Sequence, residues 1–165
     1  MRTRYWRELV EIIGIISIIA SVLLLAWEVR QSNRIASAES ELHLTSIYST
    51  IHVERASNPD FAKLFLKLEA PEKHLTTATE GSQIRGLAWH MVDIMWAVQS
   101  AYDNGLLSFA VLDAYKADLG YQMDRWPGIR PHFEFIYESN SSLHDKEIFE
   151  PIAAYIASHR VETEE

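Results

Sequence analysis

Histidines are the residues of this chain best suited to chemistry, because an imidazole ligates metals and exchanges a proton near neutral pH. The seven histidines are His43, His52, His74, His90, His132, His144 and His159. Among them, His90 lies one helical turn before Asp93, and His144 lies one turn before Glu147, so each of these pairs could supply two metal ligands. The sequence indicates no further ligand, and it contains neither HExxH nor Glu-x-x-His. We therefore expect no metal and no other cofactor.

Nucleophilic and phosphate-transfer chemistry also lack their sequence signals. The chain has no cysteine, which excludes thiolate metal sites, cysteine nucleophiles and disulfides. GxSxG, Walker and GxGxxG motifs are absent. We predict that the protein is not an enzyme and has no catalytic, cofactor-binding or metal-binding residues. A metal-dependent activity is the alternative.

Four aromatic residues in the second half of the chain are candidates for a partner or ligand surface: Trp89, Trp96, Tyr102 and Trp126. Tryptophan and tyrosine are favoured at binding hot spots. Trp89 and Trp96 lie seven residues apart and hence on one helical face, although Met91 and Ile94 between them also suit a packed core. Trp126 precedes a Pro-Gly turn, which either presents the indole outward or uses it as a lid over a helix junction. Both the surface and the core interpretation remain open.

An apolar stretch near the N-terminus is the element most distinct from the rest of the chain. No charged residue occurs from Ile12 to Trp27, and Glu11 and Glu28 bound this stretch. A helix that crosses a hydrocarbon core of about 30 Å needs about 20 apolar residues, which 9–29 provide. Aromatic residues of the kind that anchor at membrane interfaces flank it, namely Tyr5, Trp6 and Trp27. We predict a transmembrane helix at 9–29 after a short basic flank at 1–8, the alternative being a buried core helix.

The residues on either side of this stretch indicate whether it is cleaved and how it is oriented in the membrane. Arginines before it resemble the start of a secretory signal, but the long apolar run and the lack of a cleavage pattern after it favour an uncleaved anchor. Three arginines before the span and two after it leave the side of the membrane open. Residues 1–11 carry a net charge of +1 and the remainder −9, which argues against nucleic acid as a partner. An acidic domain is also repelled by anionic lipid.

One face of the predicted membrane helix carries small residues, namely Gly14, Ser17 and Ser21. Such a face allows close helix approach and interhelical hydrogen bonds. It predicts packing on a second copy or on another membrane protein, although isolated Gly and Ser are also ordinary in single-span helices. Because neither Gly nor Pro occurs between Gly14 and Pro59, we expect one continuous helix to about Ser57.

Helix boundary signals recur in the rest of the chain. Asn58-Pro59-Asp60 is typical of a helix start, Thr77 to Glu80 is a capping-box pattern, and Asn104-Gly105 is typical of a helix end. Apolar residues with a 3.6-residue period from Ile84 to Tyr102 predict a central core helix.

Three further helices are expected: one from about Ser108 to Trp126, a short aromatic one from Pro131, and a last one over 145–158 with a bend at Pro151. We thus predict an all-α protein, in which the N-terminal transmembrane helix continues through a helical extension at 30–57 into a small soluble helical domain at 58–160, followed by a frayed tail at 161–165.

Several short motifs together resemble a family of uncharacterised bacterial single-pass membrane proteins. They are Glu11-Ile12-Ile13-Gly14, Val29-Arg30-Gln31-Ser32-Asn33, Asn58-Pro59-Asp60-Phe61-Ala62, Asn104-Gly105-Leu106-Leu107 and Trp126-Pro127-Gly128. The resemblance covers most of the chain. It implies the architecture above and a place in the bacterial inner membrane, and it implies no activity.

Two functions fit these expectations. The first is an accessory, scaffolding or interaction subunit of a membrane protein complex, whose partners are the membrane and other membrane subunits or a second copy of the chain. The second is a membrane-tethered sensor that binds a small apolar or aromatic ligand in a pocket among Trp89, Trp96, Tyr102 and Trp126.

Overall fold

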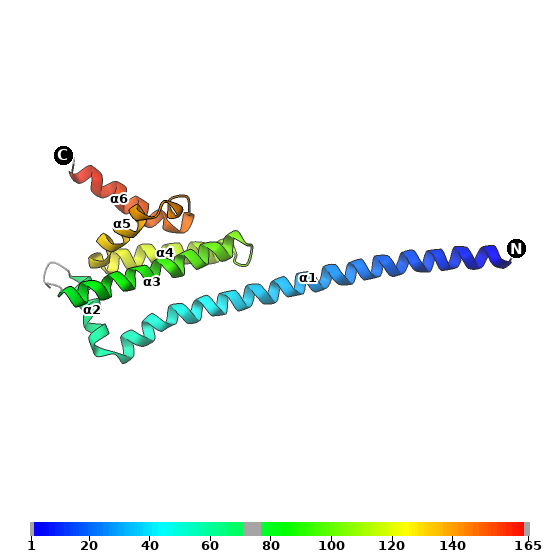
Figure 1. Ribbon diagram of the computed structural model, residues 1–165, viewed down its shortest axis with the longest axis horizontal. Helices are drawn as coiled ribbons and strands as arrows, with labels where there is room; N and C mark the ends of the chain where they lie inside the picture. Colours follow the sequence, from blue (N-terminus) through cyan, green and yellow to red (C-terminus); the bar gives the residue numbers. More distant parts are fainter. Residues whose placement is uncertain (1, 71–76, 164–165) are drawn as a thin grey trace. The chain divides into compact units, whose positions relative to one another are not determined.

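The protein is all-α, as the sequence predicts. The computed structural model (Figure 1) describes the backbone of residues 2–70 and 77–163 and the side chains of residues 5–70 and 77–158, and this part contains no strand. A long N-terminal apolar helix is followed by a small helical bundle. The helices are α1 (Arg2–Ser57), α2 (Pro59–Glu69), α3 (Ala78–Asp103), α4 (Phe109–Arg125), α5 (Arg130–Ser139) and α6 (Glu150–Thr163). Short 3₁₀ turns, η2 (Pro127–Ile129), η3 (Ser141–Leu143) and η4 (Glu147–Phe149), join the later helices.

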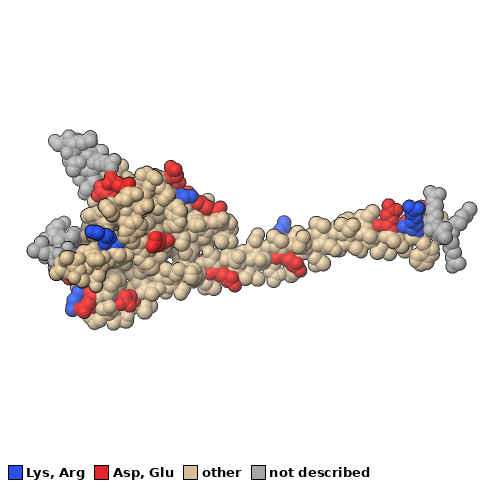
Figure 2. Space-filling model, viewed as in Figure 1, with Lys and Arg blue, Asp and Glu red and all other residues tan. Residues whose placement is uncertain are grey.

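Helix α1 belongs to two compact units, which divide between Glu39 and Ser40. In the first unit its apolar side chains are exposed, and an 18-residue window reaches a mean hydropathy of 2.7 with none of it buried within the protein. Figure 2 shows a part of this helix, between its charged N-terminal turns and the next charged side chains along it, as a surface without charged side chains. The helix is therefore not a core helix of this chain, and its length and composition are those of a membrane span.

The last turns of α1 are part of the second unit. Leu44 is buried in the core of the bundle, and Tyr48 and Ile51 pack against that core. These positions recur every three or four residues, so one stripe of the helix faces the bundle. The expected helical extension at 30–57 is thus continuous, and from Ser40 onward it lies in the same compact unit as the helices of the bundle.

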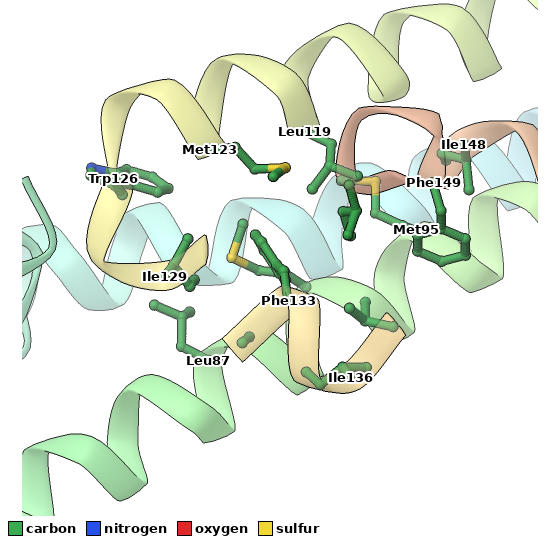
Figure 3. Close-up of a cluster of buried hydrophobic side chains, with 14 of the residues drawn as sticks. Leu87, Met95, Leu119, Met123, Trp126, Ile129, Phe133, Ile136, Ile148 and Phe149 are labelled. Atoms are coloured by element: carbon green, nitrogen blue, oxygen red, sulfur yellow. The ribbon is translucent and has the colours of Figure 1, made fainter. Parts of the chain in front are cut away.

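The core of the second unit forms around α3. Its buried face is the predicted one and carries Ile84, Leu87, Ala88, Met91, Ile94, Met95 and Val98. Figure 3 shows how α4, α5 and the 3₁₀ turns contribute the facing side chains, among them Leu119, Phe133 and Phe149. All three of these side chains are fully buried. Burying a side chain of this size typically contributes about 1.5–3 kcal/mol, so this face fixes the position of α3.

The predicted helix boundaries are confirmed where capping atoms are present. The Asn58 side chain accepts hydrogen bonds from the backbone N–H groups of Asp60 and Phe61, at 3.1 and 3.2 Å. Thr77 and Glu80 form the reciprocal capping box. Gly105 has a φ of 71°, the left-handed conformation that ends a helix.

The C-terminal helix differs from its prediction. Helix α6 begins at Glu150, so Pro151 lies in its first turn and not at a bend within it. Proline suits that position because the N–H groups of the first turn have no partner within the helix. The helix ends at Thr163. His74, the side chain of His159 and the last two residues of the tail fall outside the described residues.

Candidate functional site

The four aromatic candidates divide between surface and core. Trp89 and Trp96 lie on the outer face of α3 with 38% and 39% of their area exposed, so the core interpretation is wrong for both. Tyr102 is half-buried, and its ring lies edge-on to the Phe109 ring with 6.4 Å between the ring centroids. Trp126 retains only 7% exposure and belongs to the core cluster, so it is not part of a partner surface.

Close packing at the Pro-Gly turn explains why Trp126 is buried. Gly128 lies against α2 so tightly that a Cβ atom there would approach the Leu68 Cα to 3.1 Å. This approach brings the indole of Trp126 edge-on to the Phe65 ring, at 4.8 Å between centroids. Trp126 is therefore the lid over a helix junction, one of the two alternatives that its sequence context allowed.

A small cavity lies beside Trp96. It has a volume of about 250 Å³ and is lined by Trp96, Gln99, Ser100, Asp103, Asn104 and Lys146. The Lys146 ammonium is 2.6 Å from an Asp103 carboxylate oxygen and 5.9 Å from the centre of the Trp96 ring. Hydrogen bonds from Lys146 and Gln99 hold the pKa of the Asp103 carboxyl below its usual range. The cavity thus presents an indole face beside a fixed pair of opposite charges.

The buried amide of Gln99 holds this corner of the bundle together. Its Nε2 donates to Asp103 at 2.9 Å, and its Oε1 accepts from the backbone N–H of Ile148 at 3.1 Å. Sequence reasoning missed Gln99, Asp103 and Lys146. A signal was present, since a carboxylate in the last turn of a helix opposes the helix dipole and favours a nearby cation.

The two histidine–carboxylate pairs either have other hydrogen-bond partners or lie exposed on the surface. His144 Nε2 lies 2.9 Å from the carbonyl oxygen of Tyr137, whereas Glu147 accepts a hydrogen bond from Lys116 at 3.3 Å. His90 and Asp93 are exposed on α3. Across the described ranges, no three histidine, aspartate or glutamate side chains gather in a way that could hold a metal ion.

A second cavity of about 490 Å³ lies between α4 and α6, and none of the aromatic candidates lines it. Arg130 is one of the residues that line it, and its side chain donates hydrogen bonds to the Met123 carbonyl at 2.7 Å and to Asp124 at 3.1 Å. Its guanidinium also lies 5.2 Å from the centre of the Tyr155 ring. Gly120 lies in the wall of this cavity, and a Cβ added there would have only the Pro151 Cβ within 4 Å.

Polar groups join the end of α1 to α4. The Tyr48 hydroxyl donates to Asp118, and Gln122 Nε2 donates to the Tyr48 oxygen and, at 2.6 Å, to Asp118. Burial raises the pKa of the Asp118 carboxyl, and the hydrogen bond from Gln122 partly offsets this. Gln122 is itself buried, and its Oε1 has no hydrogen-bond partner among the described groups. No sequence motif marks these contacts.

A second contact joins α1 to the bundle through Arg55. Its guanidinium lies 4.7 Å from the centre of the Phe65 ring and 3.7 Å from a carboxylate oxygen of Glu69. Glu69 also pairs with Arg125 at 3.0 Å. Because guanidinium groups stack well on aromatic rings, this contact fixes the last turn of α1 onto α2.

The small-residue face of α1 lies exposed in the first unit. The Ser17 hydroxyl donates to the Ile13 carbonyl and the Ser21 hydroxyl to the Ser17 carbonyl, both at 2.8 Å. Nothing lies within 4 Å of a Cβ added at Gly14. Since both hydroxyl protons are satisfied within the helix, this face offers small size and acceptor oxygens to a neighbour, and no free donors.

Comparison with known proteins gives no further information, because no protein-family model, no curated protein and no solved structure matches the chain.

Proposed function

We propose that the protein is a single-pass membrane-anchored interaction subunit, whose helical unit binds another subunit of a membrane protein complex. The observation that carries this proposal is the exposure of two indoles on one face of α3. Trp89 and Trp96 keep 38% and 39% of their area in contact with solvent, and each follows a buried residue of the core face, Ala88 and Met95. Exposed tryptophans of this kind are typical of the centre of a binding surface.

The apolar part of α1 supplies the anchor in this proposal. Its 18-residue window of mean hydropathy 2.7 matches a membrane span or a signal sequence, and the missing cleavage pattern favours the span. We place the protein in the bacterial inner membrane, because the sequence motifs resemble an uncharacterised family of such proteins. Retention in the membrane pellet after alkaline carbonate extraction tests the span, and release into the supernatant would contradict it.

The charge of the second unit indicates the chemistry of the partner. Residues 12–165 carry a net charge of −9, and Asp93 is exposed on α3 between the two indoles. A partner surface with an apolar groove for the indoles and basic side chains around it would complement this face. We therefore expect the partner to be another membrane subunit with such a groove.

Site-specific photocrosslinking in intact membranes tests this surface. A photoreactive phenylalanine replaces Trp89 or Trp96, and a control chain carries it at Tyr121, an aromatic residue of α4 with 65% exposure. We expect one discrete crosslinked species from both α3 positions and not from Tyr121. Equal yields from all three positions, or crosslinks to many proteins, would contradict a defined partner surface.

The small-residue face of α1 gives a separate prediction. If it packs against a neighbouring helix, Ser17→Leu or Ser21→Leu should weaken association about tenfold or more, because the added side chain keeps the backbones apart. Ala26→Leu is the matched control, since at about 100° per residue it lies on the opposite side of the helix. The measurement is energy transfer between labelled chains in lipid vesicles. An unchanged signal in the Ser17 variant would show that this face contacts lipid.

A sensor that binds a small ligand is the second candidate function. The cavity of about 490 Å³ between α4 and α6 favours it, because the Arg130 guanidinium and the Tyr155 ring both face the hollow. This is a different place from the pocket expected among the tryptophans. A compound that raises the melting temperature of the full chain and fails to do so in Tyr155→Ala would support this function.

A further inference from the structure

A cluster of polar side chains follows the apolar stretch of α1 directly. Trp27, Arg30, Gln31 and Arg34 line one hollow of about 480 Å³ on the surface of the helix. At about 100° per residue, these four positions share an arc of about 100° on one side of the helix. Leu23 and Leu24 continue the same side into the apolar stretch. One face of the helix thus changes from aliphatic to indole to guanidinium along its length.

The two arginines are free to bind an external group. Arg30 and Arg34 are exposed, and neither forms an ion pair or hydrogen bond with another described residue. They lie one helical turn apart, about 6 Å along the axis, with the amide of Gln31 between them. Guanidinium groups bind phosphate oxygens through paired N–H donors. Glu28, the carboxylate closest in sequence, lies about 60° or more outside this arc.

We propose that this hollow binds the phosphate group of an anionic phospholipid, with the acyl chains along Leu23, Leu24 and Trp27. The inference rests on the membrane span proposed above. With Trp27 at the edge of the hydrocarbon, Arg30 lies about 4.5 Å and Arg34 about 10 Å further along the axis. That range covers the headgroup layer, which is about 5–8 Å thick, and a long arginine side chain reaches back toward it.

The site is cationic, whereas the bundle carries a net negative charge. The bundle is acidic, so a surface rich in anionic lipid repels it and cannot hold it through non-specific attraction. A preference for anionic lipid must therefore come from a local cationic site. Zwitterionic lipid also offers a phosphate, but its own ammonium group compensates the charge, so two unpaired guanidinium groups favour the anionic headgroup.

The experiment uses the full chain in nanodiscs and measures lipid retention by native mass spectrometry. Nanodiscs contain equal amounts of phosphatidylglycerol and phosphatidylcholine. We expect about tenfold enrichment of phosphatidylglycerol on the protein and its loss in Arg30→Gln/Arg34→Gln. Arg4→Gln/Arg7→Gln removes the same charge before the apolar stretch, and this control should retain the enrichment.

Two further arms distinguish the possible outcomes. Inorganic phosphate at millimolar concentration tests a site for soluble anions, and displacement of the lipid by phosphate alone would overturn the lipid assignment. Carbonate extraction of the same variants tests the membrane span. Retention in the membrane without lipid enrichment would overturn this inference alone, whereas extraction of the wild-type chain would overturn both it and the span.

Discussion

At the scale of single residues, Tyr48 and Asp118 connect elements that lie 70 residues apart in sequence. The carboxyl of Asp118 is half-buried, and its pKa is raised because burial disfavours the charged form. The hydrogen bond from Gln122 partly offsets that effect, and the Tyr48 hydroxyl donates a further hydrogen bond to the same carboxyl. This contact is therefore worth more than an exposed one, since its loss would leave a partly buried carboxylate with fewer donors.

We expect Tyr48→Phe to lower the free energy of unfolding by about 1–3 kcal/mol, because a hydrogen bond to a charged group is lost without a change in ring packing. Thermal or urea unfolding of the full chain in mild detergent measures this loss. Tyr121→Phe is the matched control, since Tyr121 lies on α4, the helix that carries Asp118, and is 65% exposed. Equal stability of the two variants would show that Tyr48 contributes packing alone.

The carboxylate of Glu80 makes the stability of the bundle depend on pH in the acidic range. Hydrogen bonds from Lys67 first and then from the Thr77 backbone lower the pKa of the Glu80 carboxyl to about 2. A carboxyl with a lowered pKa stabilises the fold fully above its ordinary pKa near 4.5, and this contribution is lost as the pH falls toward about 2. We expect melting temperatures measured from pH 7 to pH 2 to fall less steeply for Glu80→Gln than for the wild-type chain. Parallel curves would contradict this assignment.

At the scale of helices, boundaries could be predicted and lateral contacts could not. Caps depend on residues within one turn of one another, so Asn58, the Thr77–Glu80 box and Gly105 were each recognisable from local sequence. The burial of Trp126 depends on how closely Gly128 approaches Leu68 on another helix. The exposure of Trp89 and Trp96 likewise depends on which side of α3 the other helices cover. A helical period predicts a buried face but gives no information on its width.

A substitution at Gly105 tests the left-handed cap that ends α3. Its φ of 71° is costly for any residue with a Cβ, and most of all for a β-branched one. We expect Gly105→Val to destabilise the bundle by about 1 kcal/mol or more, measured by urea unfolding. Gly86→Ala is the matched control within α3, where nothing lies within 4 Å of the added Cβ, and it should stabilise the fold by about 0.5–1 kcal/mol. An unchanged Gly105→Val variant would contradict the left-handed cap.

At the scale of the whole chain, the amino-acid composition predicted the two parts but not the point that divides them. The apolar stretch and the net charge of −9 after residue 11 separate a long apolar helix from an acidic bundle. The compact bundle unit, however, begins at Ser40, well inside the continuous helix. A helix without Gly or Pro carries no local signal of where tertiary packing begins. That point depends on Leu44, Tyr48 and Ile51, which contact the bundle core.

This division predicts which part of the chain folds alone. Every residue of the buried core cluster is Leu44 or later, so a fragment of residues 40–165 should be soluble, helical and cooperative in thermal unfolding. A shorter fragment that begins at Asn58 loses Leu44, which is only 4% exposed, and the Tyr48 hydrogen bonds. We expect it to be less stable by about 2 kcal/mol or more, as for removal of a large core side chain. Circular dichroism in urea compares the two. Equal midpoints would show that the last turns of α1 take no part in the core of the bundle.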